Sequence, residues 1–309
     1  MRKLFNVLLA TATCVFASSG LIADADIDIE DLSSKKIDEE SSGGPFTASI
    51  SGDYIGRADF ECKRYTNFKF ATADIDLSFI YYYNPCLKEG ASVGVSYLRT
   101  RLDWKYNPFF TQKDIDTVSL NLACFSQRLK DWTWRAQLSV NFDNIEYWHL
   151  QNYMNYDILL WGRYDYAPNI GVHLGILALT GMKIDRVYPI IGIDWTYNCH
   201  WKLNLVFPMD ISLVYTINKC WTASLAGRFI NQRHRVKKQQ FYSEGIWFYT
   251  SSGAEFAIDY KPAKWISANI HAGVDFGGHL KVANRHYRDG HRLRFNSAPY
   301  AGAEVDMNF

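Results

Sequence analysis

The sequence predicts an all-β protein that folds as a closed antiparallel transmembrane β-barrel of about fourteen strands, roughly 12 to 16. Three observations lead to this fold class. Apolar and polar residues alternate with a period of two along most of the chain, the connections between these segments alternate between short and long, and aromatic residues gather beside the short connections. Because alternate side chains of a strand lie on opposite faces, each segment has one apolar and one polar face.

The composition excludes several other classes of protein. With 33 Lys and Arg against 32 Asp and Glu, the chain lacks the basic charge typical of nucleic-acid-binding proteins, and we expect no nucleic-acid partner. A mean hydropathy of −0.20 excludes a polytopic helical membrane protein. Aromatic residues make up 16% of the chain and only 8 residues are proline, which argues against extensive disorder.

The N-terminus is typical of an export signal. Arg2 and Lys3 precede an apolar stretch that ends in small residues and is too short to cross a hydrocarbon core of about 30 Å. We therefore interpret residues 1–19 as a signal peptide, with cleavage after Ala17 or Ser19.

The segment that follows, residues 20–45, is an acidic flexible leader. It carries eight acidic residues against two lysines and ends in a Ser/Gly/Pro-rich hinge. It is either a solvated leader or a plug inside the domain that follows it. That domain, the barrel, is predicted to span residues 46–309.

Fourteen segments show the period-two pattern of strands. In one of them, Ile266 and Ile270 lie on one face, whereas Ser267 and His271 lie on the other. Two segments depart from the pattern, because glycines dilute the first and Pro189 interrupts an apolar run. The segments begin near residues 46, 71, 90, 115, 132, 154, 169, 187, 200, 209, 219, 250, 264 and 297.

The connections between these segments alternate in length. The tight, polar ones are 84–88, 129–131, 167–169, 198–199, 218–220 and 261–264. The long ones are 58–70, 101–114, 143–153, 178–186, 231–249 and 278–296, with 208–209 as a short exception. Bacterial outer-membrane barrels have short periplasmic turns and long external loops. The pattern therefore predicts a protein of the bacterial outer membrane with its long loops outside.

Tryptophan and tyrosine residues flank the tight turns. Tyrosines precede several turns, and tryptophans follow four of them. Amphipathic rings favour the level of the lipid headgroups, so we expect a periplasmic aromatic girdle there, although a tryptophan after a turn could also cap a soluble core. The girdle comprises Trp132, Trp201, Trp221 and Trp265.

A secreted β-sandwich would show the same alternation, but fourteen strands are many for one sandwich. The polar faces also carry both signs of charge, as expected for a water-filled lumen. The last strand presents Val305, Met307 and Phe309 on one face, and this ending resembles the C-terminal assembly signal of outer-membrane β-barrel proteins. Met307 stands where an aromatic residue is common.

A second stretch carries a more specific resemblance. Residues 189–192, 201–208 and 227–228, together with Trp221, resemble a bacterial family of uncharacterised outer-membrane barrels. The resemblance is loose over 46–309 and closer over 187–230. It implies the fold and the location, but no activity. The assembly-signal ending implies an interaction with the barrel-assembly machinery.

Twelve charged residues on the polar faces are predicted to line the lumen. Fourteen strands would enclose a backbone circle of about 25–28 Å, wide enough for an aqueous passage. We expect an acidic wall opposite a basic wall, which would orient polar solutes, although any water-filled lumen needs charged residues. The acidic wall comprises Asp53, Asp74, Asp76, Glu255, Asp259, Asp275, Glu304 and Asp306, and the basic wall comprises Arg135, Arg163, Lys202 and Arg228.

Two basic runs fall in predicted external loops, at 233–238 and 285–294. They could meet the anionic lipopolysaccharide of the outer leaflet or could simply form a solvated rim. Outer-membrane lipid and lipopolysaccharide are therefore the expected non-protein partners.

The cysteines and histidines offer little catalytic or metal-binding chemistry. His173 and His271 face inward, but no recognisable motif places a Ser or Asp beside them, so we expect no enzymatic activity, cofactor or metal. Five cysteines remain after the signal peptide, with Cys62 in an external loop. The others either form the pairs Cys199–Cys220 or Cys86–Cys124, cross-link to neighbours in the envelope, or stay inert.

The function predicted from the sequence is a porin-like diffusion channel for small polar solutes. The alternative is a structural or surface-interaction (adhesin-like) barrel with an occluded lumen. An inward-folded leader or long loop would favour the alternative.

Overall fold

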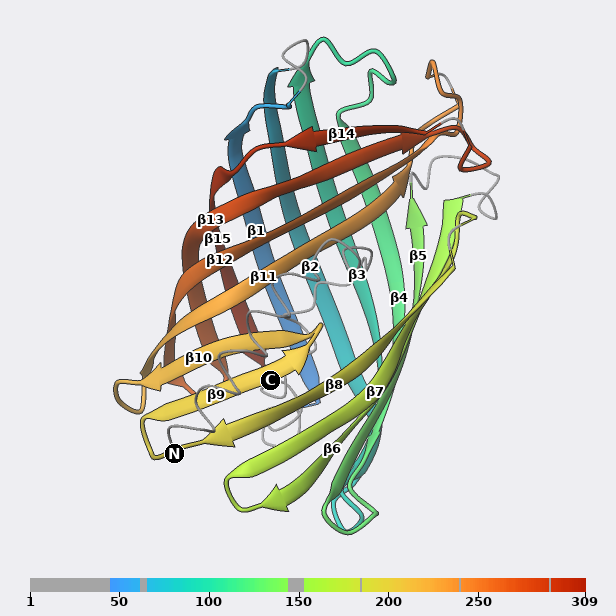
Figure 1. Cartoon of the computed structure of the whole chain (residues 1–309). Coiled ribbons are helices and arrows are strands. Elements are labelled where there is room, and N and C mark those ends of the chain that lie inside the picture. Colours follow the sequence, from blue (N-terminus) through green and yellow to red (C-terminus); the bar gives the residue numbers. More distant parts are fainter. Residues whose placement is uncertain (1–44, 62–65, 144–152, 184, 239, 289) are drawn as a thin grey trace.

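The computed structural model describes residues 45–61, 66–143, 153–183, 185–238, 240–288 and 290–309. The predicted signal peptide, the leader before Pro45, and Cys62 lie outside these ranges. Within them, fifteen strands form one antiparallel sheet (Figure 1). No helix of the described residues is long and apolar enough to cross a membrane.

The strands are tilted and differ in length. The first eight are β1 (Phe46–Ala58), β2 (Thr66–Asn84), β3 (Glu89–Lys105), β4 (Asp114–Ser126), β5 (Trp132–Asp143), β6 (Met154–Ala167), β7 (Ile170–Gly181) and β8 (Arg186–Thr196). The others are β9 (Trp201–Phe207), β10 (Asp210–Thr216), β11 (Trp221–Arg235), β12 (Ile246–Ala263), β13 (Ile266–Ala283), β14 (His291–Phe295) and β15 (Ala298–Asn308).

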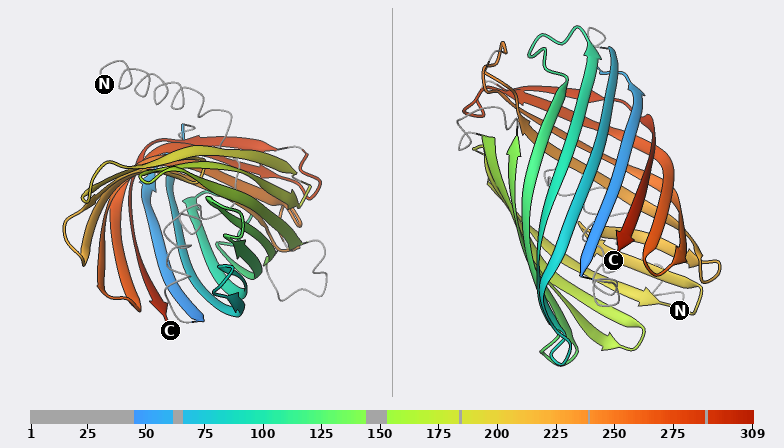
Figure 2. Two further views of the ribbon diagram at one scale, coloured as in Figure 1. Left: turned by 90° about the horizontal axis from the view of Figure 1, so that it is seen from below. Right: turned by 180° about the vertical axis from the view of Figure 1, so that it is seen from behind.

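The sheet closes on itself through its first and last strands. β1 pairs with β15 in the register Ile50↔Val305, and β15 in turn pairs with β13. The ring therefore consists of β1–β13 and β15, which confirms the predicted fourteen-stranded antiparallel barrel. At the closure, the backbone N–H of Phe46 donates to Phe309 and that of Phe309 donates to Phe46. Figure 2 shows this barrel from below and from behind.

One strand was not predicted. β14 lies within the expected long connection 278–296, pairs with the end of β13 in the register Leu280↔Leu293, and forms an isolated bridge from Phe295 to Phe60. Along β13 it continues from where β15 stops pairing, at the end of the barrel that carries the long loops. We call this end the long-loop end. The opposite end, which carries the tight turns, is the short-turn end.

Three tight turns share one local device. The side-chain Oδ1 of Asn84, Asn198 and Asn218 each accepts hydrogen bonds from the backbone N–H groups two and three residues later. Asparagine favours such turns because its side chain substitutes for a backbone acceptor. The same residue type therefore begins the turns that follow β2, β8 and β10 at the short-turn end.

The outer and inner faces of the wall follow the alternation in the sequence. On β2, Ile75, Leu77 and Phe79 point outward and are 44–45% exposed. The intervening Asp74 and Asp76 line an internal cavity. The barrel is thus apolar outside and polar inside over this region, the reverse of a water-soluble β-sandwich.

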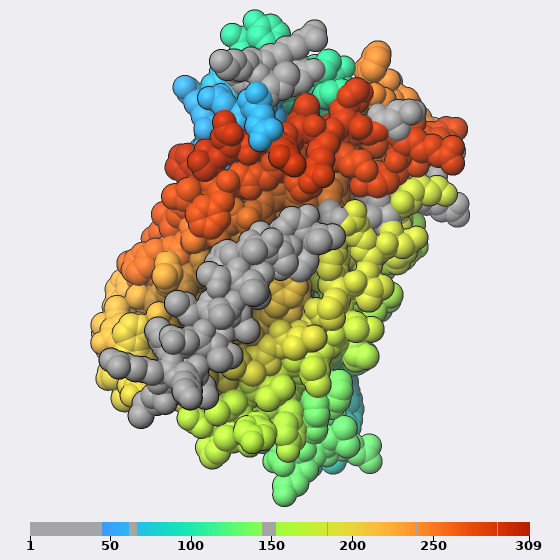
Figure 3. Space-filling view, viewed as in Figure 1, coloured from blue at the N-terminus to red at the C-terminus, as the bar shows by residue number. Residues whose placement is uncertain are grey.

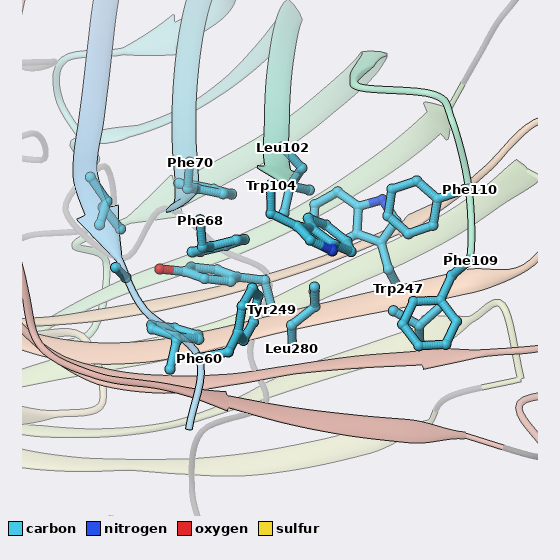
Figure 4. Close-up of a cluster of buried hydrophobic side chains, with 14 of the residues drawn as sticks. Phe60, Phe68, Phe70, Leu102, Trp104, Phe109, Phe110, Trp247, Tyr249 and Leu280 are labelled. Atoms are coloured by element: carbon cyan, nitrogen blue, oxygen red, sulfur yellow. The ribbon is translucent and has the colours of Figure 1, made fainter. Parts of the chain in front are cut away.

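The long-loop half is an exception, because its interior is an aromatic core (Figure 4). Phe68 and Phe70 of β2 and Trp104 of β3 pack against Trp247 and Tyr249 of β12. The rings of Phe70 and Tyr249 stack with centroids 4.4 Å apart and an angle of 9° between their planes. Figure 3 shows side chains of the C-terminal strands, orange to red, in a continuous band across this half.

We expect this core to dominate the stability of the barrel. Phe70 is only 1% exposed. The substitution Phe70→Ala should lower the free energy of unfolding by about 3–5 kcal/mol, because it leaves a cavity beside Tyr249. The measurement is urea unfolding in lipid vesicles, followed by tryptophan fluorescence. Phe241→Ala is the control, since Phe241 is 82% exposed and should cost at most about 0.5 kcal/mol. Equal losses for the two variants would contradict the structural role of the core.

Candidate functional site in the barrel lumen

The lumen contains a cavity of about 220 Å³ that is lined mainly by polar side chains. The lining comes from β1–β6 and β15 and from one strand of the opposite wall, β11. Its polar members are Thr47, Ser49, Asp74, Asp76, Ser78, Ser92, Ser96, Thr117, Ser119, Asn121, Arg135, Gln137, Ser139, Asn141, Asp143, Asn155, Asp157, Asn231, Gln232, Arg233, His234, Asp306 and Asn308. Four of the predicted lumen residues, namely Asp74, Asp76, Arg135 and Asp306, are therefore among its walls.

Arg228 of β11 joins strands that are not adjacent. Its Nη2 donates to Asp53 Oδ2 on β1 at 2.7 Å, and its Nη1 donates to Glu255 Oε2 on β12 at 3.2 Å. Its guanidinium also lies 3.8 Å from the ring centre of Tyr300. The prediction that Arg228 faces the acidic wall from across the lumen was wrong, because Arg228 is bonded within that wall.

The same network contains His271. Its Nε2 lies 3.0 Å from Asp53 Oδ1 and 2.6 Å from the Tyr300 hydroxyl, and its Nδ1 lies 2.7 Å from Asn269 Oδ1. Asn269 Nδ2 also donates to Asp259 at 2.8 Å. Inner-face polar groups of β1, β11, β12, β13 and β15 thereby share one connected network.

A second network lies on β6–β8. Arg163 Nε donates to Asp194 Oδ2 at 2.7 Å, and His173 Nε2 lies 2.7 Å from the same oxygen. Trp161 Nε1 donates to His173 Nδ1 at 3.2 Å, so both ring nitrogens of His173 are engaged.

Two glycines make room for these networks. A Cβ at Gly171 would lie 2.2 Å from Asp194 Oδ2, and one at Gly302 would lie 2.1 Å from Asp53 Oδ1. Any side chain at either position would displace the carboxylate. Glycines on a polar strand face, rather than a motif, were the signal that could have located both sites.

The C-terminal half of β11 crosses the lumen. The last pair between β10 and β11 is Ile211↔Gly227, and β11 then continues alongside β12 to Arg235. There, His234 lies 3.0 Å from Asp143 Oδ1 on β5 and within 3.5 Å of Thr100 Oγ1 on β3. Strands β3 and β5 are on the opposite side of the ring, where a circular barrel would place them about 25 Å away. The lumen is therefore narrowed to contact distance at this level.

The first basic run was also placed wrongly. Arg233, His234 and Arg235 are 2%, 4% and 5% exposed and belong to β11, not to an external loop. Arg233 Nη2 donates to Asp157 Oδ1 at 3.3 Å, and Arg235 Nη1 donates to the Glu244 backbone oxygen at 2.9 Å. The Arg233 and Arg235 side chains are buried because β11 is longer than its sequence pattern suggested and because hydrogen-bond acceptors lie within reach of them inside the barrel. The second basic run is exposed, at Arg285, His286, Arg288, His291, Arg292 and Arg294.

Other predicted lumen residues lie away from the cavity. Asp275 is buried beneath Tyr249, whose hydroxyl donates to it at 3.4 Å. Glu304 stands opposite Ser51 in the register of β1 and β15. Lys202 lies on β9, on the same face as Asn204.

The tryptophans and cysteines lie at the short-turn end. Three of the predicted girdle residues begin strands and the fourth immediately precedes β13; Trp201, Trp221 and Trp265 are 41–53% exposed, and Trp132 stacks on Trp134. Cys86, Cys124, Cys199 and Cys220 are free thiols, so neither predicted disulfide is formed. Cys124 stands opposite Ala91 inside β3, whereas Cys86 lies in the turn before that strand, and Cys199 and Cys220 occupy separate turns.

Comparisons with known proteins found relatives in sequence and similar solved structures. No protein-family model matches the chain. It is 23% identical over 296 residues to an uncharacterised protein of Chlamydia pneumoniae, covering 88% of this chain and 91% of that one. A similar uncharacterised protein of Chlamydia trachomatis serovar D is 23% identical over 232 residues, covering 69% and 72%.

Two solved structures illustrate the structural similarity. An outer membrane channel from Pseudomonas putida F1 has a TM-score of 0.48 and 10% identity, covering 86% of this chain and 96% of the channel. The KdgM porin has a TM-score of 0.37 and 10% identity, covering 84% and 99%.

The Arg228 network yields a stability prediction. Arg228→Met should destabilise the barrel by about 3–5 kcal/mol, because Asp53 and Glu255 would remain buried without their cation. Adding Asp53→Asn and Glu255→Gln should restore most of the loss. Urea unfolding in vesicles measures both variants. If Arg228→Met alone were as stable as the wild type, the ion pairs would have to be solvated rather than buried.

Proposed function

We propose that this protein is a barrel of the bacterial outer membrane that forms a narrow channel for small polar solutes. The observation that carries the proposal is the combination of an apolar, exposed outer face with a polar cavity inside a closed sheet. A closed barrel leaves no sheet edge whose backbone N–H and C=O groups would be unpaired in the hydrocarbon. An apolar outer face is also suited to contact with lipid chains.

The orientation follows from the two ends. Exposed aromatic residues at the short-turn end suit the periplasmic interface, and the long-loop end, with its exposed Arg285–Arg294 run, suits the lipopolysaccharide surface. The signal peptide predicted from the sequence supports export, and the ending Val305, Met307 and Phe309 supports recognition by the barrel-assembly machinery.

The narrowing at β11 restricts what this channel can pass. The crossing strand and the aromatic core close the long-loop half, while the polar cavity occupies the lumen beside them. Conduction therefore requires β11 and its neighbours to shift, and the channel is gated. The same observation favours the second candidate function, a structural or surface-interaction barrel with an occluded lumen.

The two histidine sites do not favour an enzyme. In the described part of the chain, His173 is hydrogen-bonded to Asp194 and Trp161, neither of which is paired with a hydroxyl or thiol nucleophile there. His271 is bonded to Asp53 and to the Tyr300 hydroxyl, but Tyr300 does not line the polar cavity in which a substrate would bind. A nucleophile and base within hydrogen-bond reach are the minimum for this chemistry. Networks of this kind fit a role in holding the lumen walls together.

Conductance distinguishes the channel from the occluded barrel. The double variant His234→Ala/Asp143→Ala removes the hydrogen bond between β11 and β5 and should raise the frequency of open events in planar bilayers severalfold. His200→Ala, in an exposed turn at the other end, is the control and should behave like the wild type. Silent bilayers for the wild type and the double variant alike, with folded protein inserted, would leave the occluded barrel as the function.

Thiol labelling tests the orientation. In a Cys62→Ser background, a membrane-impermeant maleimide should not react in intact cells with the thiols of the short-turn end, and should react after the outer membrane is permeabilised. Phe241→Cys, in the exposed connection at the long-loop end, should be labelled in intact cells. The reverse pattern would invert the proposed topology.

A further inference from the structure

Asn231 stands out among the polar residues of the cavity. It lies on β11, is only 4% exposed, and lines the cavity. Neither its Oδ1 nor its Nδ2 has a hydrogen-bond partner. Buried amides are normally paired, since an unused donor and acceptor inside a protein cost folding free energy.

Among the amide side chains that line the cavity, Asn231 is the one whose oxygen and nitrogen are both buried and both lack a partner in the described residues. Two residues further on the same face of β11, Arg233 is bonded to Asp157 and to the Thr180 backbone oxygen. On the facing wall, Asn141 Nδ2 donates to Asn155 Oδ1 at 2.8 Å. Acceptors and donors are therefore available around the cavity, and Asn231 is the amide left over for a solute.

The unused groups restrict the solute chemically. An ammonium group would satisfy only Oδ1, and a carboxylate would satisfy only Nδ2. A hydroxyl both donates and accepts, so adjacent hydroxyl groups satisfy the whole amide. The lining also contributes many hydroxyl and amide groups, from Ser92, Ser96, Thr117, Ser119, Asn121, Gln137 and Ser139 among others.

Charge and size restrict it further. The described lining has five aspartates against two arginines, a formal charge of −3 with His234 neutral, which disfavours anions. A cavity of about 220 Å³ lies below the roughly 300–1,000 Å³ of sites for drug-sized ligands, so the solute must be small.

From these observations we infer that the cavity is a binding site for a small neutral polyhydroxy solute, of monosaccharide size, with Asn231 as the residue that recognises its hydroxyl groups. This assignment rests on the proposed channel function and names the class of solute that the channel takes. The solute enters from the short-turn side or after the gate at β11 opens.

The substitution Asn231→Leu separates binding from folding. Leucine has a similar size but no polar atoms, and the amide makes no hydrogen bond in the protein, so the variant should be at least as stable as the wild type. The matched control is Asn204→Leu on β9, since Asn204 is also buried and has one unpartnered atom, but does not line the cavity.

The experiment uses the full chain refolded in detergent, with calorimetric titration of glucose and, in parallel, glutamate and lysine. Glucose should bind the wild type and Asn204→Leu equally and Asn231→Leu at least about tenfold more weakly. Glutamate and lysine should bind more weakly than glucose. Absent glucose binding by the wild type, unchanged binding by Asn231→Leu, or tighter binding of either amino acid would overturn the assignment.

The titration does not depend on conduction. Glucose binding by a protein that never opens in planar bilayers would refute the channel and leave the binding site standing. Open channels without glucose binding would support the channel and refute the binding site.

Discussion

The constraint on which the rest of the structure depends is that a single sheet must close. Every strand in the ring pairs on both sides, and the pairing of β1 with β15 completes it. Closure makes one face of every strand internal and the other external, so the period-two alternation becomes an apolar surface and a polar lumen. The networks around Arg228 and Asp194 exist because closure brings inner-face residues of distant strands together.

The lumen of this barrel is shaped by unequal strand lengths. β9 and β10 have 7 residues each, whereas β11 has 15. β11 therefore extends beyond the end of β10 and turns across the interior. Its two faces then have different surroundings. Phe229 packs against the apolar inner faces of β6–β9, and Trp247, beside β11 on β12, packs in the core formed with β2 and β3. Because the C-terminal part of β11 is enclosed on both faces, its basic residues 233–235 are buried inside the barrel.

The alternation in the sequence was sufficient to predict the strands of the ring and their number, because strand formation depends on residues near one another in sequence. Closure was predicted from a different constraint, since a sheet in a membrane cannot leave an unpaired edge. It was also sufficient to place Asp74, Asp76, Arg135 and Asp306 at the cavity. It could not show that Arg228 bonds Asp53 or that Asp194 meets His173, because these contacts depend on register and on the crossing of β11. The charged run at Arg233 looked like a loop because charge is usually solvated, and only its acceptors on the far wall reveal otherwise.

The aromatic core and the unused amide of Asn231 impose opposite requirements on the same strands. A core of stacked rings resists motion because close packing leaves few alternative arrangements. Beyond Phe229 and Ile230, Arg233 and His234 of β11 contact β3, β5 and β6 through hydrogen bonds and ion pairs, which a bound solute or water can replace one for one. Movement that admits a solute should therefore separate β11 from β3–β6 along this polar boundary while the stacked rings hold β12 against β2. Asn231 lies on the moving strand at that boundary, so a solute bound to it would act directly on the element that closes the lumen.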